Sequence, residues 1–61
     1  MRSEYINAEI YIYNLPGEIK TGYIVARQDA ARLWYYGTFD TEERAKEVAV
    51  ELGNGVVIKT R

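Results

Sequence analysis

The start of the chain alternates between aliphatic and polar or aromatic residues. Between Tyr5 and Tyr13 the alternation has a period of two, which is typical of a strand with one buried face. The even positions of this stretch are aliphatic: Ile6, Ala8, Ile10 and Ile12. The odd positions are mainly tyrosine. We therefore predict one strand over Tyr5–Tyr13, with its aliphatic side facing the core.

Turn residues and two further strands follow. The segment Asn14–Glu18 contains Pro16 and Gly17 and predicts a type II turn, because Pro presets the first central φ and Gly accepts the positive second one. A second strand is expected over about Ile19–Gln28. Its alternation is poor, so its register stays open. A third strand is expected over about Leu33–Phe39.

The next stretch has helical periodicity. Asp40 is the expected N-cap, and Glu43 three residues later completes a capping box. A narrow apolar stripe follows at Ala45, Val48, Ala49 and Leu52, and it marks the face that packs on the sheet. Gly53 is the natural helix end. A last short strand is predicted over Val56–Thr60.

The element order β-β-β-α-β predicts an α+β fold of one small domain over residues 1–61. We expect an antiparallel three-stranded sheet, backed by one helix, with a short fourth strand at the C-terminus. The helix returns the last strand parallel to the third by a right-handed crossover. The last strand lies either beside the third or at an edge beside the first, and we favour the edge.

One helix covers one face of such a sheet, so we expect the opposite face to expose aromatic side chains. The candidates are Tyr5, Tyr11, Tyr13, Tyr23, Trp34 and Tyr36. Contiguous exposed aromatic area often marks an interface, and Tyr and Trp are common anchors of binding surfaces. The alternative interpretation is that cross-strand Tyr pairs merely stabilise a bare sheet face. We favour the interaction role, with a partner protein or a second copy of the chain as the ligand.

The composition limits the ways in which so small a chain can be stabilised. The chain has 61 residues, a net charge of −1, and neither Cys nor His, which removes disulfides and zinc-thiolate sites. A core of this size seldom supplies more than about 3–5 kcal/mol. Two routes remain, a dense aromatic core or self-association. The near-zero net charge argues against nonspecific nucleic-acid binding.

The residues for catalysis are missing. Ser3 is the only serine, and there is no His to activate it, so we expect a non-enzyme with no cofactor. Glu43, Glu47 and Glu51 share a helix face, which we interpret as solvated rather than metal-binding. Glu42 and Lys46 are spaced for an ion pair. No apolar run reaches a membrane span of about 18 residues, and no signal-peptide core is visible, which favours a cytoplasmic location.

One local segment resembles a known family. Residues 36–45, Tyr-Gly-Thr-Phe-Asp-Thr-Glu-Glu-Arg-Ala, resemble the strand-to-helix junction of plant ethylene-response-factor DNA-binding domains and of the arm-binding domains of tyrosine integrases. In those families a three-stranded sheet lies in the DNA major groove. The resemblance implies sequence-specific DNA binding, with Lys20, Arg27 and Arg32 as the nucleic-acid-binding residues. Those families carry more basic residues on that face, and here Glu9, Glu18 and Asp29 offset the three.

The chain as a whole is similar in style to small accessory proteins of bacteriophages. That likeness implies an inhibitor or adaptor that covers a functional surface of a larger host complex, such as a defence nuclease. Met1 and the charged end Lys59-Thr60-Arg61 favour a complete small protein over a domain of a longer chain. The leading hypothesis is a protein-binding module, and the alternative is a DNA-binding domain.

Overall fold

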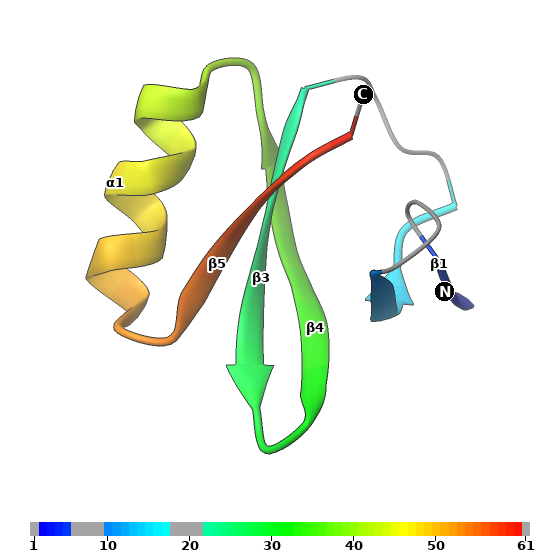
Figure 1. The fold of residues 1–61 in the computed structure, drawn as a ribbon. Helices are drawn as coiled ribbons and strands as arrows, with labels where there is room; N and C mark the ends of the chain where they lie inside the picture. Colours follow the sequence, from blue (N-terminus) through cyan, green and yellow to red (C-terminus); the bar gives the residue numbers. More distant parts are fainter. Residues whose placement is uncertain (1, 6–9, 18–21, 61) are drawn as a thin grey trace.

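The computed structural model describes residues 2–5, 10–17 and 22–60. Within them the chain forms one helix and five strands (Figure 1). In chain order the elements are β1 (Arg2–Tyr5), β2 (Tyr11–Leu15), β3 (Tyr23–Asp29), β4 (Arg32–Phe39), α1 (Glu42–Leu52) and β5 (Gly55–Lys59). The predicted α+β class is confirmed.

The sheet has the order β1-β2-β4-β3-β5. Strands β1 and β2, β3 and β4, and β3 and β5 pair antiparallel, whereas β2 and β4 run parallel. The expectation of a purely antiparallel three-stranded sheet is therefore wrong. The last strand runs in the same direction as β4, as predicted, but it lies beside β3 and not beside either expected neighbour.

The prediction of one continuous first strand is wrong. Tyr5 of β1 lies opposite Tyr11 of β2 in an antiparallel pair, so the alternating stretch belongs to two strands and not to one. Ile6 and Ala8 of the predicted aliphatic side lie outside the described residues, whereas Ile10 and Ile12 contribute to the core. The alternating pattern correctly places Ile10 and Ile12 in the core, but it does not show that Tyr5 and Tyr11 belong to different strands.

A bulge in β2 changes which residues are buried. Asn14 adopts a positive φ of 68°, which Asn tolerates better than most residues, and its backbone N–H donates to Ser3 Oγ at 3.3 Å. An extra residue on β2 between the pairs at Ile12 and Leu15 lets both point inward, and both have 0% exposure. The predicted type II turn over Asn14–Glu18 is not formed as expected: Asn14 and Leu15 belong to β2, and Gly17 lacks the positive φ that this turn needs. Glu18 lies outside the described residues.

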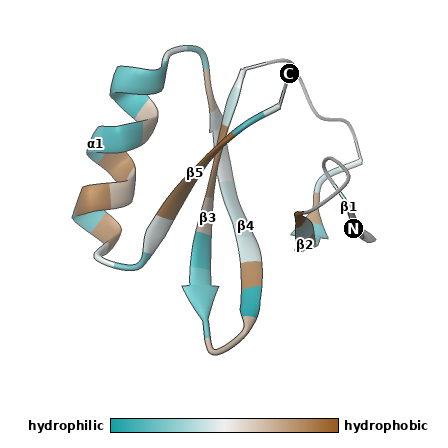
Figure 2. Ribbon diagram, in the orientation of Figure 1, coloured by the Kyte–Doolittle hydropathy of each residue, from teal (hydrophilic) through white to brown (hydrophobic). Residues whose placement is uncertain are grey.

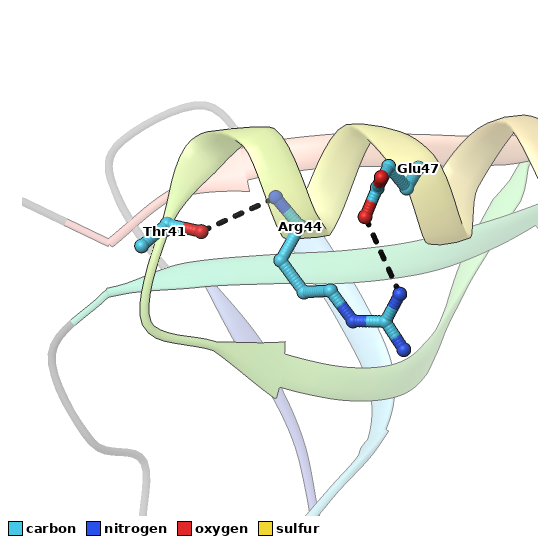
Figure 3. Close-up of polar contacts among 3 residues, drawn as sticks. All are labelled: Thr41, Arg44 and Glu47. Carbon is cyan, nitrogen blue, oxygen red and sulfur yellow. Dashed lines mark hydrogen bonds and ion pairs between the residues drawn. The ribbon is translucent and has the colours of Figure 1, made fainter.

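The N-cap of the helix lies one residue later than predicted. Thr41 is the N-cap, and its hydroxyl accepts the Arg44 backbone N–H at 3.2 Å (Figure 3), so the capping box from Asp40 to Glu43 is not formed. The predicted apolar stripe is confirmed as the face against the sheet. Gly53 ends the helix with a φ of 81°. Lys46 and Glu42 form the expected ion pair, with Nζ and Oε1 3.7 Å apart.

Strand β3 is buried on both of its faces. Its consecutive residues Ile24, Val25 and Ala26 all have 0% exposure, which a sheet with one bare face does not produce. Val25 belongs to a helix-side cluster, completed by Ala45, Val48 and Ala49. The antiparallel pair of strands β1 and β2 is called the β1–β2 ribbon below. Ile24 and Ala26 belong to a second cluster on the side of this ribbon, the ribbon-side cluster, which Ile12, Leu15 and Ile58 complete.

The two clusters explain the layers of the molecule. Helix α1 and the β1–β2 ribbon lie on opposite sides of β3 and β5 (Figure 1), and hydrophobic residues of α1 and β5 meet on the helix side (Figure 2). The ribbon stays joined to β4 while it covers the second face, so the sheet curls around the ribbon-side cluster. The expectation that the face opposite the helix is uncovered is wrong.

Helix α1 and strand β5 lie close together at a glycine. A Cβ added at Gly55 would lie 2.5 Å from the Ala49 Cα and 2.8 Å from its carbonyl oxygen. These distances are far below van der Waals contact. The small residues Ala49 and Gly55 therefore set the spacing between α1 and β5.

Candidate binding surface

Four aromatic rings form a continuous row across three strands. The ring centroids of Tyr5 and Tyr11 are 5.0 Å apart, those of Tyr11 and Tyr13 are 5.1 Å apart, and those of Tyr13 and Trp34 are 5.1 Å apart. The first two pairs meet edge to face, and the third is tilted by 35°. These four residues are called the aromatic stripe below.

The strand register puts the stripe on one face. Tyr5 pairs with Tyr11, and Tyr13 pairs with Trp34, while Tyr11 and Tyr13 are two residues apart on one strand and so point to the same side. The Tyr11 hydroxyl also donates to the Ser3 carbonyl oxygen at 3.2 Å, which fixes its ring over β1. Local pairing thus holds the row of rings in place.

This face is the one that α1 partly covers, and not the opposite one. Trp34 pairs with Arg27 of β3, and Arg27 is two residues from Val25 of the helix-side cluster. The stripe therefore continues the helix-covered face across β4, β2 and β1. Along this row the outermost ring, Tyr5, has 61% exposure, and Tyr11 has 37%.

Two arginines border the stripe. The Arg32 guanidinium carbon lies 5.4 Å from the Tyr13 ring centroid, which is within the range of a cation–π contact. Arg27 is the cross-strand neighbour of Trp34 and is exposed. An open cleft of about 340 Å³ next to the stripe is lined by Arg27, Asp29, Trp34 and Asn54. The surface therefore combines a row of aromatic rings with two guanidinium groups, and Asp29 adds a carboxylate to the cleft.

The remaining predicted residues lie elsewhere. Tyr23 is half-buried and packs on the helix-side cluster, so it lies apart from the aromatic stripe. Tyr36 has 50% exposure and is the extra residue where the pairing of β3 and β4 shifts. It makes no ring contact with another described aromatic residue. Lys20 lies outside the described residues.

Sequence reasoning missed two residues of the cleft, Asp29 and Asn54. Asp29 ends β3 beside the hairpin, and the Asn54 amide donates to the Gln28 carbonyl oxygen at 3.0 Å. Asn54 lines the cleft only because β5 pairs with β3, and these two strands are far apart in the sequence. No local signal in the chain identifies it.

The described residues contain no group of three acidic side chains placed to hold a metal ion. Nor is any helix among them long and apolar enough to cross a membrane.

No protein-family model, no curated protein and no solved structure matches the chain.

Proposed function

We propose that the chain is a non-enzymatic protein-binding module whose binding surface is the aromatic stripe. The observation that carries the proposal is the row of four touching rings that stays open to solvent at Tyr5 and Tyr11. Tyr and Trp side chains offer large contact area with few rotatable bonds. Prior ring–ring contact reduces the freedom that each side chain loses on binding.

Charge defines the partner more closely. Arg32 stacks on Tyr13 and Arg27 borders Trp34, so an apolar segment that carries carboxylates fits this surface better than a basic one. Desolvated arginine–carboxylate pairs add orientation and specificity to the aromatic contact. A protein that acts by covering a surface in this way suits the role of an inhibitor or adaptor of a larger complex.

A library of random peptides displayed on phage, selected against the purified protein, tests the proposal. We expect enriched peptides to combine aromatic or aliphatic residues with Asp or Glu. Tyr11→Ala should weaken the selected peptides by about tenfold or more, as loss of an interface anchor does. Circular dichroism of each variant checks that the fold is retained.

Tyr36→Ala is the matched control. It removes the same side chain from a similarly exposed position outside the stripe, so we expect less than about a twofold effect on peptide affinity. Failure to enrich any peptide, or equal losses in the two variants, would contradict the proposal.

A second candidate function is nucleic-acid binding, which the stacking of Arg32 on Tyr13 favours. Aromatic rows with cations bind single strands, and a sheet face reads duplex DNA in the families that residues 36–45 resemble. We expect little affinity, because only two cations border the stripe among the described side chains and Asp29 lies in the same cleft. Oligo-dT of about 12 nucleotides, a usual site size, and a mixed-sequence duplex are the probes. Tight, salt-sensitive binding that Arg32→Ala abolishes would replace the first proposal with this one.

A further inference from the structure

Strand β5 forms an outer edge of the sheet, and its hydrogen-bonding pattern can be assigned residue by residue. The Gln28 N–H donates to the Asn54 carbonyl oxygen at 2.9 Å, and the Thr60 N–H donates to that of Gly22 at 3.0 Å. In an antiparallel ladder hydrogen-bonded and non-hydrogen-bonded pairs alternate. Residues 56 and 58 therefore direct their N–H and C=O groups toward β3, and Gly55, Val57 and Lys59 direct theirs outward.

No strand pairs with these outward groups in the part of the chain that the structure describes, where β5 is the last strand of the sheet. Unpaired edges are usually blunted by proline, bulges, inward-pointing charges or very short strands. Strand β5 is five residues long, contains no proline, and pairs with β3 without a register shift. Its one charged residue, Lys59, stands at its end.

The opposite edge of the sheet is different. Strand β1 has four residues, and its pairing with β2 is irregular between Arg2 and Glu4. An irregular, short edge is a poor template for another strand. The contrast singles out β5 as the edge suited to pair with a further strand.

We propose that β5 pairs antiparallel with β5 of a second copy of this chain, and so joins two sheets into one around a twofold axis. The outward residues are centred on Val57, so Val57 lies opposite its counterpart and Gly55 of one copy lies opposite Lys59 of the other. An edge with this spacing is self-complementary, as a twofold interface requires. The pairing also places no two like charges directly opposite each other.

The composition of the core favours a second copy as the occupant. A chain of 61 residues without disulfides needs an additional source of stability, and a dense aromatic core was one of the two routes open to it. The residues described as buried are all aliphatic, and three of the nine are alanines. Tyr23, Tyr35 and Phe39 pack against the two buried clusters but are only partly buried themselves. The aromatic residues therefore border the core without filling it, which favours self-association as the additional source of stability.

Sedimentation equilibrium from about 10 µM to about 1 mM protein, the range in which small interfaces associate, measures the pairing. We expect a monomer–dimer equilibrium in the wild type. Lys59→Pro removes one outward N–H from each copy, and should weaken association by about tenfold or more because two intermolecular hydrogen bonds are lost. Lys59→Ala keeps the N–H and should associate as the wild type does.

Amide hydrogen exchange at the two ends of this concentration range locates the contact. The amides of Val56 and Ile58 should be protected at both concentrations, and the Val57 amide should become protected only at the higher one. A wild-type monomer at 1 mM, equal association of the two Lys59 variants, or a dimer that Tyr11→Ala dissociates would each overturn the proposal. The last result would assign self-association to the aromatic stripe instead.

Discussion

The two sides of β3 are covered in different ways. On the helix side Val25 meets a regular amphipathic helix whose stripe is readable in the sequence. On the ribbon side Ile24 and Ala26 meet Ile12 and Leu15, which point the same way only because β2 bulges at Asn14. The comparison shows that a small sheet does not need a second helix to bury both of its faces. A curled pair of strands covers the second face and leaves its own tyrosines outward.

The largest expected loss of stability comes from truncating a buried residue of the ribbon-side cluster. Leu15→Ala removes a fully buried side chain and should lower the free energy of unfolding by about 3 kcal/mol, within the usual range for such cavities. Leu52→Ala is the control on the helix side, where the same substitution at a half-buried site should cost about half as much. Urea denaturation of both variants gives the two values. A smaller loss of unfolding free energy in Leu15→Ala than in Leu52→Ala would contradict the account, because Leu15 would then not be part of a packed core.

A smaller effect is expected where helix and sheet touch. Gly55→Ala places a methyl group against the backbone of Ala49, and overpacking of this kind costs about 1–3 kcal/mol. Thermal unfolding should report the loss. Gly17→Ala is the control, because nothing lies within 4 Å of a Cβ at that position. Equal melting temperatures for the two variants would mean that α1 does not approach β5 as closely as described.

The smallest effect concerns the start of the helix. Thr41→Ala removes the hydroxyl that accepts the Arg44 N–H and should cost about 1 kcal/mol. Asp40→Ala should cost less than about 0.5 kcal/mol, as most exposed substitutions do. If the order of the two is reversed in denaturant unfolding, the cap belongs to Asp40, as the sequence alone suggested.

These regions also differ in how far the sequence predicts them. The stripe of α1, its end at Gly53 and the strand over residues 33–39 depend on local periodicity and capping, and they were predicted to within about a residue. The antiparallel pairing of Tyr5 with Tyr11 and the inward orientation of Leu15 were not. The first depends on strand pairing and the second on the positive φ of Asn14, and a period-two pattern encodes neither.

The candidate site was predicted only in part, for the same reason. Four of the six predicted aromatic residues do form one surface, because Tyr5 pairs with Tyr11, and Tyr13 pairs with Trp34. Tyr23 lies apart from this row and packs on the helix-side cluster, which the open register of its strand did not reveal. The contact of Arg32 with Tyr13 requires the parallel pairing of β2 with β4, which no local motif announces.

The central claim is that the β1–β2 ribbon closes the second face of the sheet and turns its tyrosine rings outward. Solvent paramagnetic relaxation, measured by NMR with a soluble gadolinium chelate on dilute protein, tests it most directly. We predict strong relaxation of the Tyr5 and Tyr11 ring protons and little at the methyl groups of Ile12, Leu15 and Ile24. Methyl groups of Leu15 and Ile24 relaxed as strongly as the Tyr11 ring would contradict the account, because the face would then be bare.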